Sequence, residues 1–514
     1  MRPIRLISGF LTVGVWTLAS RILGFVRDAI ILAYLGTGPA YEAYVVAFRL
    51  PNMFRRFFAE GAFNMAFIPI FSKKLEAGED AEGFAAQAFG GLASILIALT
   101  LIAQLAMPWL IYGLASGFAG QEQFDLSVEF GRIAFPYILF ISLAALLSGV
   151  LNAMGRFAAA AAAPVLLNVM LVSVLVTTAL IGGDIARALI WTIPLAGLAQ
   201  LALVWIAAKR AGFHVLLRRP RLTPDMRRLI RIAIPAALAG GVVQVNLLVG
   251  QQVASYFDRA VGWLYAADRL YQLPLGVVGI AIGVVLLPDL SRRLKADDHD
   301  GARNALSRAA EVSLALTIPA AVALVVIPLP LVSVLFERGA TTSDDSAAIA
   351  LAVAIYGLGL PAFVVQKILQ PLFFAREDTR RPFNYAVVAM VINAGVAIGL
   401  APVLGWISCA IATTLAGWAM VALLAIGTRP MGQVARFDAR FHGRIWRIIA
   451  ASAVMGICLW AAMAVLMPFL GTPGLRYPAL ALLIVLGMVS YFGTGQLIGA
   501  FRLSEFKSAL KRGG

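Results

Sequence analysis

"ASRILGFVRDAIILAYLG", from Ala19 to Gly36, is an apolar stretch interrupted by Arg21, Arg27 and Asp28. Its length and hydropathy are those of part of a membrane-spanning helix. A charged side chain at the centre of a bilayer costs roughly 2.5–3.5 kcal/mol on insertion scales, so such residues usually serve a function. The stretch therefore predicts a membrane helix whose charged side chains have partners or a ligand.

The rest of the chain has the same apolar character. Of its 514 residues, 61% are hydrophobic and 13% are charged, against about 45–50% and about 25% in soluble proteins. Long apolar runs recur to the C-terminus, and the alternating strands of a β-barrel would not produce them. The sequence predicts an all-α polytopic membrane protein.

We expect about fourteen transmembrane helices. The first is expected to be retained rather than removed as a signal peptide, because arginines interrupt its apolar run. The predicted ranges are 8–35, 42–71, 84–114, 127–151, 158–181, 186–208, 229–256, 262–290, 306–336, 346–373, 383–402, 405–428, 447–469 and 476–500.

The distribution of Lys and Arg predicts the orientation. Of the 42 such residues, the odd-numbered connections hold only Arg187, Arg259, Arg338 and Arg476. Because cytoplasmic loops carry the excess of positive charge, both termini are predicted to be cytoplasmic. The net charge of +16 then reflects loops that contact anionic phospholipids, and nucleic acid is not expected as a partner.

Two segments 219 residues apart are similar: "FIPIFSKKL" at 67–75 and "LLPDLSRRL" at 286–294. They end the predicted second and eighth helices, which point the same way across the membrane. A parallel repeat of two six-helix lobes, as in transporters with two similar halves, is therefore predicted, with two extra C-terminal helices. The predicted parts are a first lobe at 1–208, a basic linker at 209–228, a second lobe at 229–428, a basic loop at 429–446 and the last two helices with a basic tail at 447–514.

Arginines outnumber acids within the predicted spans. A surplus of buried cations needs water or an anionic ligand, and arginine binds phosphate in a fork geometry. We therefore predict a hydrated cationic cavity between the lobes; the alternative is that these arginines pair internally or extend to the membrane surface. The arginines are Arg21, Arg27, Arg49, Arg55, Arg56 and Arg269, and the acids are Asp28, Glu60 and Asp268.

Several activities lack a sequence signal. No GxxxxGK[ST] phosphate loop is present, so the chain is not an ATP-driven pump by itself. Its acids are scattered beside arginines, so we expect no enzyme and no catalytic residue. Two cysteines and three histidines predict neither a disulfide framework nor a metal site.

Four motifs together resemble the MurJ (MviN) family of lipid II flippases, within a larger superfamily of multidrug, oligosaccharidyl-lipid and polysaccharide exporters. The motifs are "SRILGFVRD" (20–28), "FRLPNMFRRFFAEGAF" (48–63), "ADRLYQLPLGVVGIAIGVVLLP" (267–288) and "FFARED" (373–378). The resemblance implies a flippase of the bacterial inner membrane. Its substrate would be lipid II, the undecaprenyl-diphosphate-linked peptidoglycan precursor, which it would carry to the periplasmic leaflet by alternating access.

The same resemblance implies roles for individual residues. The essential cavity arginines of the family match Arg21, Arg27, Arg55 and Arg269, which would bind the diphosphate or the sugar-peptide head group. Helices 13 and 14 would form a groove for the lipid tail. Supporting or gating roles are expected for Asp28, Glu42, Arg49, Arg56, Glu60 and Asp268.

Two positions depart from the family pattern. Glu42 replaces a common Asp, and the seventh helix lacks the acid that contributes to a sodium site in some members. This puts sodium coupling in doubt and leaves another ion gradient or the membrane potential as the driving force. We expect no cofactor.

Rival functions remain open from the sequence. One is export of another polyprenyl-linked saccharide or of a cationic drug, although a drug exporter would need acids in its cavity. The other is a structural scaffold of cell-wall synthesis without transport. We expect a monomer, with the cell-wall synthesis machinery as a further partner.

Overall fold

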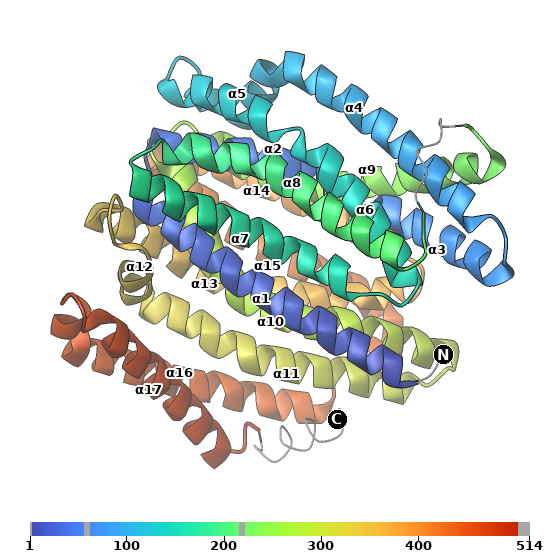
Figure 1. Cartoon of the computed structure of the whole chain (residues 1–514). Coiled ribbons are helices and arrows are strands. Elements are labelled where there is room, and N and C mark those ends of the chain that lie inside the picture. The colour runs from blue at the N-terminus through green and yellow to red at the C-terminus, as the bar shows by residue number, and fades with distance from the viewer. Residues whose placement is uncertain (1–2, 56–61, 215–220, 502–514) are drawn as a thin grey trace. The chain divides into compact units, whose positions relative to one another are not determined.

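A computed structural model of the chain (Figure 1) describes residues 3–55, 62–214 and 221–501. Within these ranges, side chains are described except at 3–12, 62–65, 235–247, 277–285, 287 and 288. The described residues form helices joined by short connections and contain no strand. The predicted all-α fold is confirmed.

The chain divides into two compact units. Unit 1 comprises Met1–Gly262 with Gly339–Thr341, and unit 2 comprises Trp263–Arg338 with Thr342–Gly514. The helices of unit 1 are α1 (Pro3–Leu35), α2 (Pro39–Arg55), α3 (Ala62–Ala77), α4 (Ala81–Leu114), η2 (Ser116–Phe118), α5 (Glu122–Ala134), α6 (Tyr137–Ala153), α7 (Ala158–Ile181), α8 (Ile185–Arg210) and α9 (Pro224–Ala254).

Unit 2 holds the remaining helices, apart from the first three residues of α10, which belong to unit 1. They are α10 (Ala260–Lys295), α11 (His299–Val326), α12 (Pro328–Phe336), α13 (Ser343–Phe374), α14 (Arg380–Leu404), η3 (Gly405–Ile407), α15 (Ser408–Thr428), η4 (Arg429–Ala435), α16 (Ala439–Leu470) and α17 (Arg476–Leu497).

The observed helices match the predicted ranges, but three ranges contain two helices each. The range 127–151 is divided between α5 and α6 at Pro136, and 306–336 between α11 and α12 before Pro328. Proline disfavours the helical conformation in the residue before it, and Ile327 accordingly has φ −122° and ψ 41°. The range 42–71 includes α2 and the first part of α3, and its middle, with Arg56 and Glu60, lies outside the described residues.

Nine helical stretches within the described ranges are long and apolar enough to cross a membrane. The chain is therefore a multi-pass membrane protein. The predicted lobes were defined by the sequence repeat, whereas the two units are compact groups of helices, and α9 belongs to unit 1 although its sequence lies in the second predicted lobe. The lobe boundaries stay a prediction.

In unit 1, α7 lies beside both α1 and α8 (Figure 1). In unit 2, α16 and α17 form a pair, and α16 packs on α11 (Figure 1). Gly456 allows the close approach of α16 to α11, because a Cβ at this position would lie 2.9 Å from Cγ1 of Val322. These two groups of helices carry the polar clusters described next.

Candidate functional site

A buried arginine joins α1 to α7 in unit 1. The Arg27 side chain is 8% exposed, and its Nε and Nη2 donate to Oδ1 of Asp28 at 2.9 and 2.6 Å. Nη1 donates to Oδ1 of Asn168 at 2.8 Å. Asn168 Nδ2 in turn donates to the Ser20 carbonyl at 3.0 Å. All three guanidinium nitrogens therefore donate hydrogen bonds within the protein.

Helical periodicity explains this arrangement. Ser20, Gly24 and Arg27 lie at positions i, i+4 and i+7 of α1, so they share the face that Asn168 approaches. A Cβ at Gly24 would lie 3.6 Å from Nδ2 of Asn168, an ordinary contact distance. Asn168 thus lies against two turns of α1 and fixes the orientation of Arg27.

The other predicted residues of α1 and α2 have different environments. Arg21 is exposed, and no hydrogen bond or ion pair joins it to another described residue. Asp28, although nearly in line with Arg21 along the helix, is buried at 7% exposure. Arg49 and Arg55 are half-buried. Arg21 is thus the predicted arginine of α1 that is open to a ligand.

Glu42 is 1% exposed and lies at the start of α2. Its Oε1 accepts a hydrogen bond from the backbone N–H of Val261 at 3.1 Å, in the first turn of α10. A carboxylate at a helix N-terminus satisfies a backbone donor and interacts favourably with the helix dipole. Glu42 therefore joins α2 to the first turn of α10, and its supporting or gating role stays a prediction.

Unit 2 contains the remaining predicted pair, Asp268 and Arg269 on α10. Nη2 of Arg269 lies 3.9 Å from Oδ2 of Asp268, and both side chains are 29% exposed. The Arg269 guanidinium carbon also lies 4.3 Å from the centre of the Tyr265 ring, in cation–π geometry. Gln272 donates to Asp268 from the next turn.

The predicted substrate-binding set is divided between the units. Arg21, Arg27 and Arg55 belong to unit 1, and Arg269 belongs to unit 2. Their convergence in one cavity stays a prediction.

Unit 2 also contains an ion cluster that was not predicted from the sequence. Glu311 on α11 is 6% exposed and accepts hydrogen bonds from Arg308, Arg440 and Arg444. Arg308 also donates to Asp438, the N-cap of α16. An acid five residues inside a predicted span, with Arg308 three residues before it, was the available signal, but Arg440 and Arg444 come from the start of α16, about 130 residues later.

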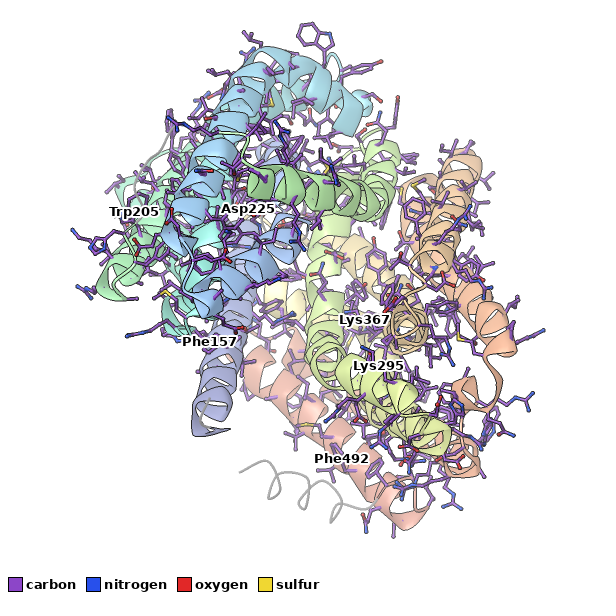
Figure 2. All side chains as sticks on the ribbon, turned by 90° about the vertical axis from the view of Figure 1, so that its right-hand side faces the viewer. Phe157, Trp205, Asp225, Lys295, Lys367 and Phe492 are labelled. Carbon is purple, nitrogen blue, oxygen red and sulfur yellow. The ribbon has the colours of Figure 1, made fainter. Side chains whose placement is uncertain are left out.

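An apolar groove of about 240 Å³ lies among α11, α12, α16 and α17. Pro319, Leu331 and Leu459 line it, and so does Phe492, which is labelled on α17 in Figure 2. The groove involves the two C-terminal helices for which the family resemblance implies a lipid-tail groove.

The sequence predicts neither a disulfide nor a metal site for the two cysteines and three histidines. Cys409 is buried and Cys458 is exposed, and both are free thiols. Across the described ranges, no group of three or more His, Cys, Asp and Glu is placed to hold a metal ion. The side-chain hydroxyls of Thr413 and Thr414, on α15, each donate a hydrogen bond to a backbone carbonyl at 2.9 Å.

Comparisons with known proteins agree with the motifs. The family model for "Lipid II flippase MurJ" matches residues 31–475. A "Probable lipid II flippase MurJ" of Rhizobium tropici is 43% identical over 99% of this chain and 97% of its own length. One of Rhizobium meliloti (strain 1021) is 44% identical over the same shares.

A solved structure titled "Lipid II flippase MurJ, inward closed conformation" has the same fold, with a TM-score of 0.79 and 23% identity. It covers 95% of this chain and 98% of its own. The family resemblance of the four motifs is thereby confirmed.

Proposed function

Because this chain belongs to the MurJ family of lipid II flippases, we propose that it moves lipid II from the cytoplasmic to the periplasmic leaflet for peptidoglycan synthesis. Members of this family are transporters and not enzymes. Beyond family membership, we propose the direction in which lipid II moves, the residues that bind it and the conformational cycle.

Arg21 is the observation that carries the binding proposal. It lies on α1, the predicted first membrane helix, is exposed, and has no ion-pair partner among the described residues. Arg27, six residues later, already donates from all three nitrogens. We therefore assign direct contact with the diphosphate to Arg21 and a positioning role to Arg27, which ties α1 to α7.

Arg269 is the corresponding group of unit 2. Tyr265 covers one face of its guanidinium, and Asp268 lies at the limit of ion-pair distance. In unit 1, Arg55 at the end of α2 is a further cation in addition to Arg21. Bidentate binding of phosphate by arginine would provide the recognition, while the two lobes alternate between inward-open and outward-open states.

The polyprenyl tail needs an apolar path, because it is far longer than the head-group site. The groove among α11, α12, α16 and α17 supplies apolar side chains of this kind, including Leu331 and Phe492. We assign the tail to this groove and the head group to the arginines. Either an ion gradient or the membrane potential acting on the cationic site would drive transport.

The test is transport of fluorescent lipid II in proteoliposomes by the full chain. Arg21→Ala removes a charge-assisted contact, so transport should fall about 10- to 100-fold at equal protein insertion. Arg187→Ala is the matched control, because Arg187 is also exposed but pairs with Glu129 at 2.9 Å. It should retain transport within about twofold.

Three outcomes would reject parts of the proposal. Full transport by Arg21→Ala would remove Arg21 from the site. No transport of lipid II by the native chain, with transport of another polyprenyl-linked saccharide, would favour the rival exporter. Depletion in the host that leaves outer-leaflet lipid II unchanged, with no second flippase present, would favour the scaffold.

A further inference from the structure

Unit 1 contains a second groove, of about 460 Å³, formed by α4, α5, α6 and α8. Most of its lining is apolar and includes Pro136, Phe140, Trp191 and Leu195. Trp191 and Leu195 are 57% and 56% exposed, so the groove opens on the outside of the helix group. A groove with such walls on a membrane protein suits an acyl chain.

One charged side chain, Arg132 of α5, lies on the wall of this groove. Its Nε donates to the backbone carbonyl of Gln104 at 3.2 Å, and Gln104 Nε2 donates to the backbone carbonyl of Arg132 at 2.8 Å. This exchange fixes the guanidinium on α4. Among the described residues, no carboxylate forms an ion pair with Arg132 and no acceptor is bonded to its two Nη atoms.

Arg132 lies five residues inside the predicted span 127–151, near the end that the charge pattern predicts to be periplasmic. Arg187 pairs with Glu129 and with Asp184 at the end of the helix group that the charge pattern predicts to be periplasmic. Arg132 lies three residues beyond Glu129, and Trp191 four residues beyond Arg187. At 1.5 Å per residue, these side chains start about 4.5 and about 6 Å further into the membrane. Tryptophan is typical of this interfacial level.

We propose that this groove binds an anionic phospholipid of the outer leaflet. The phosphate would accept hydrogen bonds from the two Nη atoms of Arg132, and one acyl chain would lie over Phe140, Trp191 and Leu195. Arginine is the residue best suited to bind phosphate through two parallel hydrogen bonds. The lipid would neutralise a membrane-embedded cation that no described acid reaches.

Close packing between two helices of the groove wall, α6 and α8, favours a fixed site over general lipid contact. A Cβ at Gly197 would lie 2.7 Å from Cδ2 of Tyr137, so α8 approaches α6 closely. Tyr137 in turn donates to Oε1 of Gln200 at 3.3 Å. The α6–α8 pair that carries part of the groove wall is therefore closely packed, and Arg132 is the only cation among the described residues that line the groove.

The experiment places a fluorophore beside the groove and measures which lipid is near it. Leu105, next to Gln104 and 78% exposed, is changed to Cys in a Cys409→Ser, Cys458→Ser background. The labelled full chain is placed in bilayers of phosphatidylcholine containing brominated phosphatidylglycerol or brominated phosphatidylcholine. Bromine quenches only a fluorophore within contact range, so quenching reports the local lipid.

We expect phosphatidylglycerol to be favoured over phosphatidylcholine about fivefold at this reporter. In Arg132→Gln, the two lipids should quench the fluorophore about equally. Arg132→Lys keeps the charge and should retain part of the preference. Arg187→Gln, an equal charge change on the same face, should leave the preference unchanged.

The proposal is overturned if quenching by the two lipids is equal in the native chain. It is also overturned if Arg132→Gln keeps the preference, or if Arg187→Gln removes it to the same extent. Leu195→Trp, which fills the groove, tests the acyl-chain part: it should lower quenching by both lipids, and unchanged quenching would reject the groove as the binding place.

Discussion

Two buried ion clusters, one in each unit, differ in their numbers of arginines and carboxylates. Around Arg27, the guanidinium donates to the carboxylate of Asp28 and to the side-chain amide of Asn168. Around Glu311, three arginines surround one carboxylate, with Asp438 beside them. Among these described groups, the first cluster has one arginine and one carboxylate, and the second has three arginines and two carboxylates.

Position along the helices explains the difference. Arg27 lies well inside α1, where an uncompensated charge would be expensive. Glu311 is bound by residues of the first two turns of α16, and Arg440 is 47% exposed, so water reaches this cluster. The cluster with more arginines than carboxylates thus lies at a helix end that water reaches.

The largest effect is expected at Arg27. Arg27→Ala removes the guanidinium that pairs with the buried Asp28 carboxylate, which should destabilise the protein by about 3–5 kcal/mol. Thermal unfolding followed by fluorescence-detected size exclusion measures this loss. Arg27→Ala with Asp28→Ala removes both charges and should recover part of the stability.

The same double variant sharpens the functional comparison. If it is stable and transports lipid II, Arg27 acts through structure alone. If Arg27→Ala is as stable as the native chain, the contacts of Arg27 with Asp28 and Asn168 are not what holds α1 and α7 together.

A smaller effect is expected at Glu311. Glu311→Gln weakens three charge-assisted hydrogen bonds and leaves three arginines close together. Because solvent screens the cluster, the loss of stability should be about 1–2 kcal/mol. The same thermal assay applies, and protease cleavage in the connection before α16 should become faster.

The arginines of this cluster provide an internal control. Arg444 is 14% exposed and Arg440 is 47% exposed. Arg444→Gln should therefore destabilise more than Arg440→Gln. The reverse order would contradict the role given to solvent.

The smallest effect is expected at Asp298, the exposed N-cap of the helix that carries Glu311. The backbone N–H of Gly301 donates to its carboxylate at 2.8 Å, and this bond, together with Arg293, lowers the pKa of Asp298 below its ordinary value of 3.8. A lowered pKa in the folded state means that the carboxylate stabilises the protein above about pH 3.8 and loses this contribution as pH falls through the folded pKa.

Asp298→Ala should lower the thermal midpoint slightly at pH 7 and have less effect at pH 3. Asp298→Asn is the matched control, because asparagine also caps a helix but does not titrate. It should keep the midpoint at pH 7 and lose this part of the acid dependence. Equal pH dependence in all three chains would contradict the assigned cause.

Local patterns predicted the helices well and the clusters only in part. Arg27 and Asp28 are neighbours in the chain, so a charged pair inside the first helix was visible. Asn168 lies 141 residues away from Arg27, on a helix whose sequence predicts an ordinary apolar span. Glu311 pairs with Arg440 and Arg444, which lie about 130 residues later in the chain. Neither partnership has a sequence signal, because periodicity describes one helix at a time.

The sequence by itself determined that this chain is an all-α membrane protein, which ranges form helices, and which family it belongs to. These features follow from local hydropathy, proline positions and contiguous motifs. Only the tertiary structure decided that Arg27 is satisfied internally while Arg21 is open, and that Arg132 lies on an apolar groove. The physical reason is that a charge in a membrane is stabilised or left available by side chains from other helices, and helix packing brings those side chains together.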